Sequence, residues 1–130
     1  MVKSLNYLKT VYPNSSLDIS VPLICAPQVW NLGSPGAGTT VSILDTGVQS
    51  NHPFLAGRVI EEACYSSNTS WDSGTSLCPS GVERSTAVGS AIPCVYICQH
   101  GTHVAGIAAG RASGSTTFNG VAPDASIFAI

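Results

Sequence analysis

Apolar positions in this chain form short runs separated by long polar stretches. The run over 41–44 ends at Asp45, as in a buried parallel strand with a polar residue at its carboxyl end. A weaker strand is expected near 58–60, and the alternating sequence ASIFAI (125–130) predicts a third. The three segments predict a sheet built from short strands.

Small residues dominate 98–114, CQHGTHVAGIAAGRASG, and predict a helix over about 101–112. Gly106 and Gly110 would each cost about 1 kcal/mol in that helix relative to alanine. We therefore expect the helix to lie very close to another backbone, with Gly106, Ala109 and Gly110 against the central sheet. A shorter helix is expected over about 27–33.

The order of these elements predicts the fold class. Strand, excursion, helix and strand are typical of an α/β fold with a parallel β-sheet flanked by helices. The 130 residues suffice for one domain with a hydrophobic core. Residues 65–93 show no sustained period and are interpreted as a long surface excursion.

Composition narrows the classes of partner and compartment. Only 9% of the residues are charged, against roughly 25% in typical soluble domains, and the net charge is −2. Because Lys and Arg do not cluster, no nucleic-acid partner is expected. No apolar run approaches the ~20 residues that span a bilayer, so no membrane span is expected. Four clustered cysteines in a low-charge, Ser-, Thr- and Asn-rich chain favour an oxidising compartment, so we expect a secreted protein, although residues 1–16 do not resemble a signal peptide.

Two residues are candidate catalytic groups. Asp45 follows an apolar strand at the carboxyl edge of the sheet, where α/β proteins place their sites; the alternative is an aspartate that caps a turn. His100 opens the small-residue helix, whose positive end disfavours an imidazolium. A nearby carboxylate would offset that effect and fix which ring nitrogen carries the proton, as a general base requires. The alternative for His100 is a histidine packed in the core.

The sequence CVYICQHGTH (94–103) offers a different chemistry. It reads Cys-x3-Cys-x-His-x2-His, so all its Cys and His residues are potential zinc ligands. Zinc sites usually separate two ligand pairs by about a dozen residues, which this sequence does not. A small zinc-binding domain is therefore the less favoured alternative.

Three motifs occur in the chain in a fixed order: VSILDTGVQSNHPFL, HGTHVAGIAAG and NGVAPDASIFAI. Together they resemble the subtilisin-like serine protease (subtilase) family over about 22–130, interrupted by 65–93. The resemblance implies a subtilisin-like three-layer fold and peptide-bond hydrolysis through an Asp-His-Ser triad, with protein or peptide substrates. It implies that Asp45 is the triad carboxylate and His100 the general base.

Part of the family pattern has no match in this chain. The nucleophilic serine, in Gly-Thr-Ser-x-Ala, and the oxyanion asparagine are both missing. The resemblance thus implies the N-terminal part of a catalytic domain over 22–130, truncated after the first strands and inactive alone. A prosegment junction or N-terminal extension is expected over 1–21, and a cysteine-bearing insertion at about 64–98. Thr102 and His103 are expected to fix the start of the helix. The alternative function is a catalytically inactive binding scaffold.

The resemblance also bears on cofactors and assembly. Many relatives have a calcium-binding aspartate directly after the His-Pro of the first motif, where this chain has Phe54. The sequence therefore indicates no definite cofactor. Calcium binding by the full-length protein stays an open alternative. A monomer is expected.

The four clustered cysteines allow three pairings. Because Cys94 and Cys98 are close in sequence, we expect each to pair with Cys64 or Cys78. Cys25 is expected to be either a buried free thiol or the partner of a cysteine outside this chain.

Overall fold

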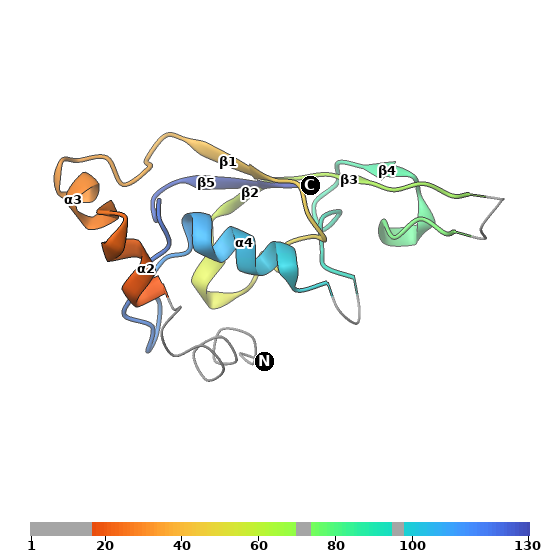
Figure 1. Cartoon of the computed structure of the whole chain (residues 1–130). Helices are drawn as coiled ribbons and strands as arrows, with labels where there is room; N and C mark the ends of the chain where they lie inside the picture. Colours follow the sequence, from red (N-terminus) through yellow and green to blue (C-terminus); the bar gives the residue numbers. More distant parts are fainter. Residues whose placement is uncertain (1–16, 70–73, 95–97) are drawn as a thin grey trace.

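A computed structural model describes residues 17–69, 74–94 and 98–130 (Figure 1). The expected junction over 1–21 lies mostly outside the described residues. The elements, with η for a short 3₁₀ helix, are α2 (Leu17–Leu23), α3 (Ala26–Asn31), β1 (Thr40–Ile43), η1 (Pro53–Leu55), β2 (Val59–Glu62), β3 (Cys64–Tyr65), η2 (Pro79–Gly81), β4 (Arg84–Ser85), α4 (His100–Ala109) and β5 (Ser126–Ala129).

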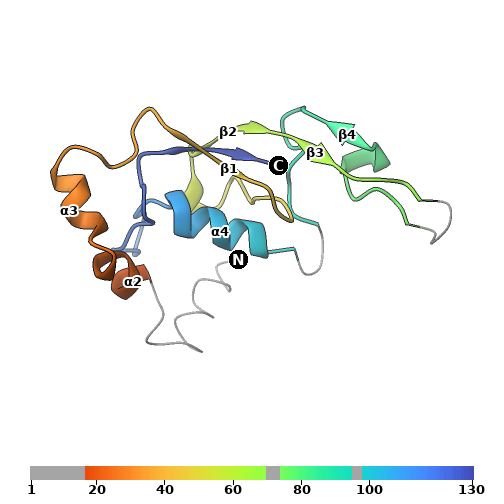
Figure 2. The same ribbon diagram turned by 45° about the horizontal axis from the view of Figure 1, so that its top comes forward.

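The main sheet is parallel and has the strand order β1-β5-β2. Strand β5 lies in the centre, where Ala129 is paired with Ile43 on one side and with Glu62 on the other. Helix α4 runs along one face of this sheet (Figures 1 and 2). The predicted α/β class is confirmed, and the described residues supply the sheet and one layer of helix.

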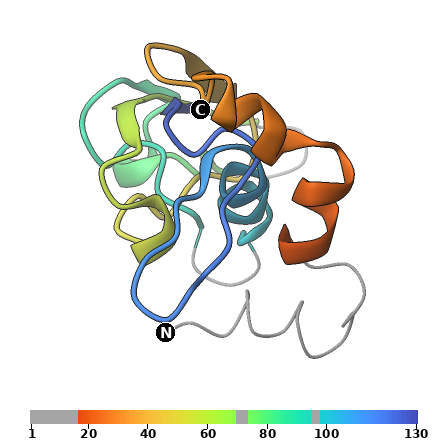
Figure 3. The same cartoon turned by 90° about the vertical axis from the view of Figure 1, so that its left-hand side faces the viewer.

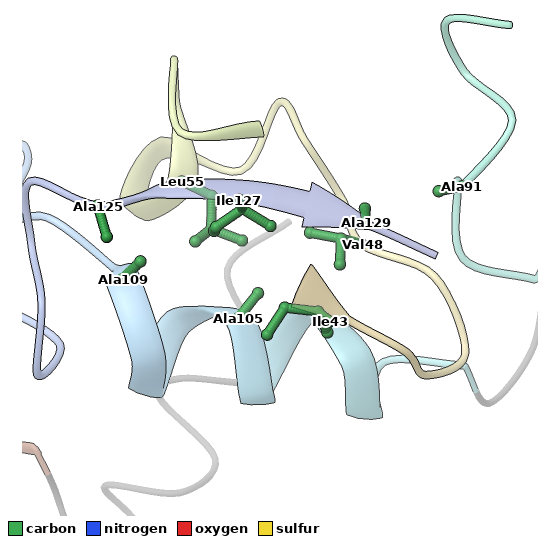
Figure 4. Packing of buried hydrophobic residues seen from close by; sticks show 9 residues of the cluster. All are labelled: Ile43, Val48, Leu55, Ala91, Ala105, Ala109, Ala125, Ile127 and Ala129. Carbon is green, nitrogen blue, oxygen red and sulfur yellow. The ribbon is translucent and has the colours of Figure 1, made fainter. Parts of the chain in front are cut away.

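Helix α4 approaches the sheet closely because its inner face carries alanines. Ala105 and Ala109 are fully buried and pack toward Ile127 of β5 (Figure 4). The prediction for Ala109 is thus confirmed. Gly106 and Gly110 instead make room for Phe54, since a methyl group on either would contact the ring of Phe54 in η1.

The helix is also shorter than predicted. It ends at Ala109, because Gly110 leaves the helical conformation for an extended one (φ −64°, ψ 144°). The Gly110 carbonyl then accepts a hydrogen bond from the amide of Gly120 (2.8 Å). This bond closes the loop that leads from α4 to β5.

The long excursion has more order than its sequence predicts. Strands β3 and β4 form an antiparallel pair that projects beyond the carboxyl ends of the main strands (Figures 1 and 2). The expected disulfide pairing is wrong: Cys64 is bonded to Cys78, and Cys94 to Cys98. The Cα atoms of Cys94 and Cys98 lie 5.2 Å apart, a normal disulfide distance. Each cysteine is thus bonded to the one nearest to it along the chain.

Helices α2 and α3 lie at the opposite end of the molecule from the excursion (Figure 1), and Figure 3 views the molecule from that end. The indole of Trp30 in α3 donates a hydrogen bond to the carbonyl of Val121 (2.8 Å). Cys25, between the two helices, is exposed and has no disulfide partner within the described ranges, so the expectation of a buried thiol is wrong. Among the helices described, none has the length and apolar character needed to cross a membrane.

Candidate active site

Asp45 and His100 meet at the carboxyl edge of the sheet. Asp45 lies two residues beyond the end of β1, and its amide donates a hydrogen bond to the carbonyl of Ile130 (3.0 Å), beyond the end of β5. His100 is the first residue of α4. Its Nδ1 lies 2.7 Å from Oδ2 of Asp45, although the two residues are 55 positions apart in sequence. The Asp45 side chain is 15% exposed and that of His100 is 71% exposed.

Chemistry fixes the roles of the two ring nitrogens. A carboxylate can only accept hydrogen bonds, so Nδ1 of His100 carries the proton and Nε2 has a free lone pair. Desolvation raises the pKa of Asp45, but hydrogen bonds from the Thr46 amide and from His100 outweigh it and leave that pKa below its usual value. Asp45 is therefore ionised at neutral pH and holds the imidazole in one tautomer.

Side chains next to the pair join its two elements. The Thr46 hydroxyl accepts a hydrogen bond from the Gly101 amide (3.2 Å), and the Thr102 hydroxyl accepts one from the Gln49 amide (2.9 Å). Gly101 lies so close to the carbonyl oxygen of Gly47 that a Cβ at this position would collide with it. Sequence reasoning missed the role of Thr46, because it acts on a helix more than fifty residues away.

His103 lies near the pair but makes no bond to it. Its side chain is half-buried, and its Nε2 has no hydrogen-bond partner within the described part of the chain. Burial, and then the charge of His100, lower the pKa of His103. Its amide donates to the carbonyl of Gln99, as any helical amide in this turn would (3.1 Å).

The zinc alternative is contradicted. Cys94 and Cys98 share a disulfide, so neither offers the thiolate that zinc would bind. Across the described ranges, no three His, Cys, Asp or Glu side chains gather as a metal-binding group.

The residues around Phe54 do not fit calcium either. The Phe54 ring is 2% exposed and lies edge-on to the ring of Phe118, with their centres 5.6 Å apart. The Phe54 carbonyl accepts a hydrogen bond from the Arg111 amide (2.9 Å), and Oδ1 of Asn119 accepts one from the Ala112 amide (2.7 Å). A buried apolar ring therefore stands where the family resemblance led us to look for a calcium-binding carboxylate.

A pocket of about 450 Å³ adjoins Asp45. It lies between the segments that follow β1 and β2, and Tyr65, Leu77 and Ile92 of the excursion form part of its wall. These three side chains are more than half exposed. The excursion thus borders the candidate active site.

The arrangement supplies the proton-transfer groups of nucleophilic catalysis. A histidine that is oriented by a carboxylate and has an exposed ring can take a proton from a nucleophile. Among the described residues, no serine, threonine or cysteine side chain is hydrogen-bonded to His100. The geometry therefore provides a general base and its orienting carboxylate, without a nucleophile.

Comparison with known proteins gives a consistent result. Residues 36–130 match the Subtilase family. Thermitase from Thermoactinomyces vulgaris is 38% identical over 107 residues, which cover 82% of this chain and 30% of thermitase. Minor extracellular protease Vpr from Bacillus subtilis is 39% identical over 113 residues, 87% of this chain and 12% of Vpr. The Major intracellular serine protease of the same bacterium is 32% identical over 117 residues, 89% of this chain and 30% of that relative.

Proposed function

Because the chain belongs to the subtilase family, we propose that it supplies the general base and the orienting carboxylate of a serine-type endopeptidase. The observation that carries this proposal is the 2.7 Å contact between Nδ1 of His100 and Oδ2 of Asp45 at the carboxyl edge of the sheet. The chain spans no more than about 30% of the three relatives described above. The activity therefore belongs to a protein in which another segment contributes the serine.

In the proposed mechanism, His100 moves the proton. Its Nε2 accepts the proton of the serine hydroxyl as the serine oxygen attacks the carbonyl carbon of a peptide bond. The same nitrogen then gives the proton to the departing amine, and water releases the acyl group by the same route in reverse. Asp45 keeps the ring in place and offsets the positive charge that His100 carries in between.

Substrates, location and assembly follow as parts of the same proposal. Peptide-bond hydrolysis implies protein or peptide substrates. Relatives include a protease named extracellular and one named intracellular. The two disulfides favour an oxidising compartment, so we place this protein outside the cell, as a monomer.

Substitution in the full protein tests the two roles. We expect Asp45→Asn to lower kcat by about 10⁴-fold, because the tautomer of His100 is no longer fixed. His100→Ala should lower kcat by about 10⁶-fold, because no base remains. His103→Asn should keep most of the activity, since His103 makes no bond to the pair. Steady-state hydrolysis of a peptide substrate measures all three, and a fully active His100→Ala variant would refute the mechanism.

A second test uses the chain by itself. Residues 1–130 should not hydrolyse peptides, because they lack the nucleophile and an oxyanion hole. The full protein, assayed beside the chain at equal concentration, is the control. Hydrolysis by the purified chain that survives removal of contaminating proteases would overturn this part of the proposal.

A further inference from the structure

Glu62 is an unusual residue for the end of a strand in the main sheet. It is the last residue of β2, is paired with Ala129 of β5, and is only 9% exposed. The ion pairs found among the described residues join other groups, so no cation neutralises it there. One carboxylate oxygen, Oε1, has no hydrogen-bond partner within the same described ranges. Burying a carboxylate with an unpaired oxygen lowers the stability of the fold, so a residue of this kind suggests a role other than stabilisation.

The other oxygen of Glu62 holds the excursion where it returns to the domain. Oε2 accepts a hydrogen bond from the amide of Gly89 (2.5 Å). Gly89 has a left-handed backbone (φ +83°), which favours glycine. Ser90 and Ala91 follow and are both 3% exposed, so the segment Gly89–Ile92, which we call the return segment, enters the core at these two residues.

The return segment supports the loop that carries Asp45. The carbonyl of Ala91 accepts a hydrogen bond from the amide of Val48 (2.7 Å). Gly47 lies against the same backbone, since a Cβ at Gly47 would be 2.7 Å from the carbonyl oxygen of Ile92. On its other side the loop is bound to α4 through Thr46. The Asp45 loop is thus held between the return segment and the helix that carries His100.

From these contacts we infer that Glu62 is a positioning residue for the Asp45–His100 pair, acting through the return segment. This inference rests on the proposed function. Glu62 ends β2 and Asp45 lies just beyond β1, and these two strands flank β5. The Glu62–Gly89 bond therefore fixes the return segment to the sheet from which the Asp45 loop leaves. If the bond is lost, Gly47 and Val48 lose their support and Asp45 moves relative to His100.

Three variants of the full protein test this role. Glu62→Ala removes the acceptor, and Glu62→Gln keeps one for the Gly89 amide. Glu61→Ala is the matched control, because it removes the same charge from the neighbouring, exposed position of β2. Active sites are counted by titration with a fluorophosphonate that labels the catalytic serine, so that kcat refers to correctly folded molecules alone.

We expect Glu62→Ala to lower kcat per titrated site by about 10- to 100-fold with KM little changed, because small displacements of catalytic groups have effects of this size. Glu62→Gln should restore most of the rate, and Glu61→Ala should match the wild type. A Glu62→Ala variant that loses only titratable sites, with kcat per site unchanged, would overturn the inference.

A readout without turnover separates this inference from the proposed function. The proton between Nδ1 of His100 and Asp45 gives a low-field NMR signal when the bond is short and charge-assisted. We expect Glu62→Ala to weaken or shift this signal and Glu62→Gln to retain it. An unchanged signal in Glu62→Ala contradicts the positioning role, whereas an inactive wild-type protein with a normal signal contradicts the proposed function alone.

Discussion

At the scale of single residues, glycines decide how closely the two halves of the candidate site approach. Gly101 lies against the carbonyl of Gly47, so helix α4 begins in direct contact with the Asp45 loop. A Cβ added at Gly106, about one and a half turns further along the same helix, would lie 3.4 Å from the Phe54 ring, an ordinary contact distance. The space at position 101 thus admits only glycine, whereas position 106 has room for a methyl group.

Alanine at these two positions should have opposite effects. Gly101→Ala forces a methyl group onto a backbone oxygen, and overpacking of this kind costs about 1–3 kcal/mol. Gly106→Ala should be neutral or stabilise by up to about 1 kcal/mol, because alanine favours the helix. Urea unfolding curves of the two variants measure the difference. Equal losses in both would show that space at the start of α4 is not limiting.

A second prediction at this scale concerns pH. Burial lowers the pKa values of His52 and His103 in the folded chain, so folding favours their neutral forms. The stability they contribute is fully present above the pKa of an unfolded histidine, about 6.5. That contribution is lost as the pH falls through the lowered folded values. Thermal unfolding should therefore show a lower Tm at pH 5 than at pH 8.

His52 allows a sharper form of the test. Its Nδ1 accepts a hydrogen bond from the Phe54 amide (3.2 Å), which a protonated ring cannot do. Asparagine at this helix-cap position keeps an acceptor without titrating. His52→Asn should therefore lose less Tm between pH 8 and pH 5 than the wild type. An identical loss would exclude His52 as a source of the pH dependence.

At the scale of elements, the loop between α4 and β5 is held by apolar contact and hydrogen bonds. Phe54 of η1 packs against α4 and against Phe118 of the loop, and its carbonyl binds the Arg111 amide. Phe54→Ala should destabilise the protein by about 3–5 kcal/mol, as expected for a buried aromatic side chain.

Calcium provides the control for that prediction. Because an apolar ring and not an oxygen ligand stands at position 54, the loss caused by Phe54→Ala should be the same in excess calcium and in EDTA. Differential scanning calorimetry under the two conditions gives both values. A wild-type loop that is protected from proteolysis by calcium, with the protection absent in Phe54→Ala, would contradict this account.

The elements also show which features of the fold the sequence pattern predicts. Strands β1 and β5 and helix α4 are predictable, because each carries an apolar or small-residue pattern with its own period. The faces of α4 are not, because Gly106 and Ala105 are both small and only the tertiary neighbours distinguish them. The sequence places Asp45 and His100 at element ends, but the contacts of Thr46 and Glu62 depend on packing between distant segments and have no local signal.

At the scale of the whole molecule, each disulfide closes a loop of its own within the cysteine-bearing segment 64–98. Cys64 and Cys78 are 14 residues apart, and Cys94 and Cys98 are 4 apart. The pairing could not be predicted because three connectivities fit the same four positions. Neither bond joins the two loops, so each is expected to act independently.

Removal of the disulfides should therefore be additive. Loop-closure entropy predicts a loss of about 3 kcal/mol without Cys64–Cys78 and about 2 kcal/mol without Cys94–Cys98. Urea unfolding of the two Cys→Ala double variants and of the quadruple variant measures this, and clear non-additivity would contradict it. Peptide mapping without reduction checks the pairing itself, which a peptide linking Cys64 to Cys94 or Cys98 would refute.

The central place of β5 has a consequence for the order of events during synthesis. Strands β1 and β2 are both finished long before β5, yet neither can pair with the other, because β5 lies between them. As the chain leaves the ribosome, no parallel pair of this sheet can form until residues 126–129 emerge. We therefore expect the edges of β1 and β2 to stay unpaired while residues 63–125 are made, and the Asp45–His100 pair to be fixed to the complete sheet only after β5 has emerged.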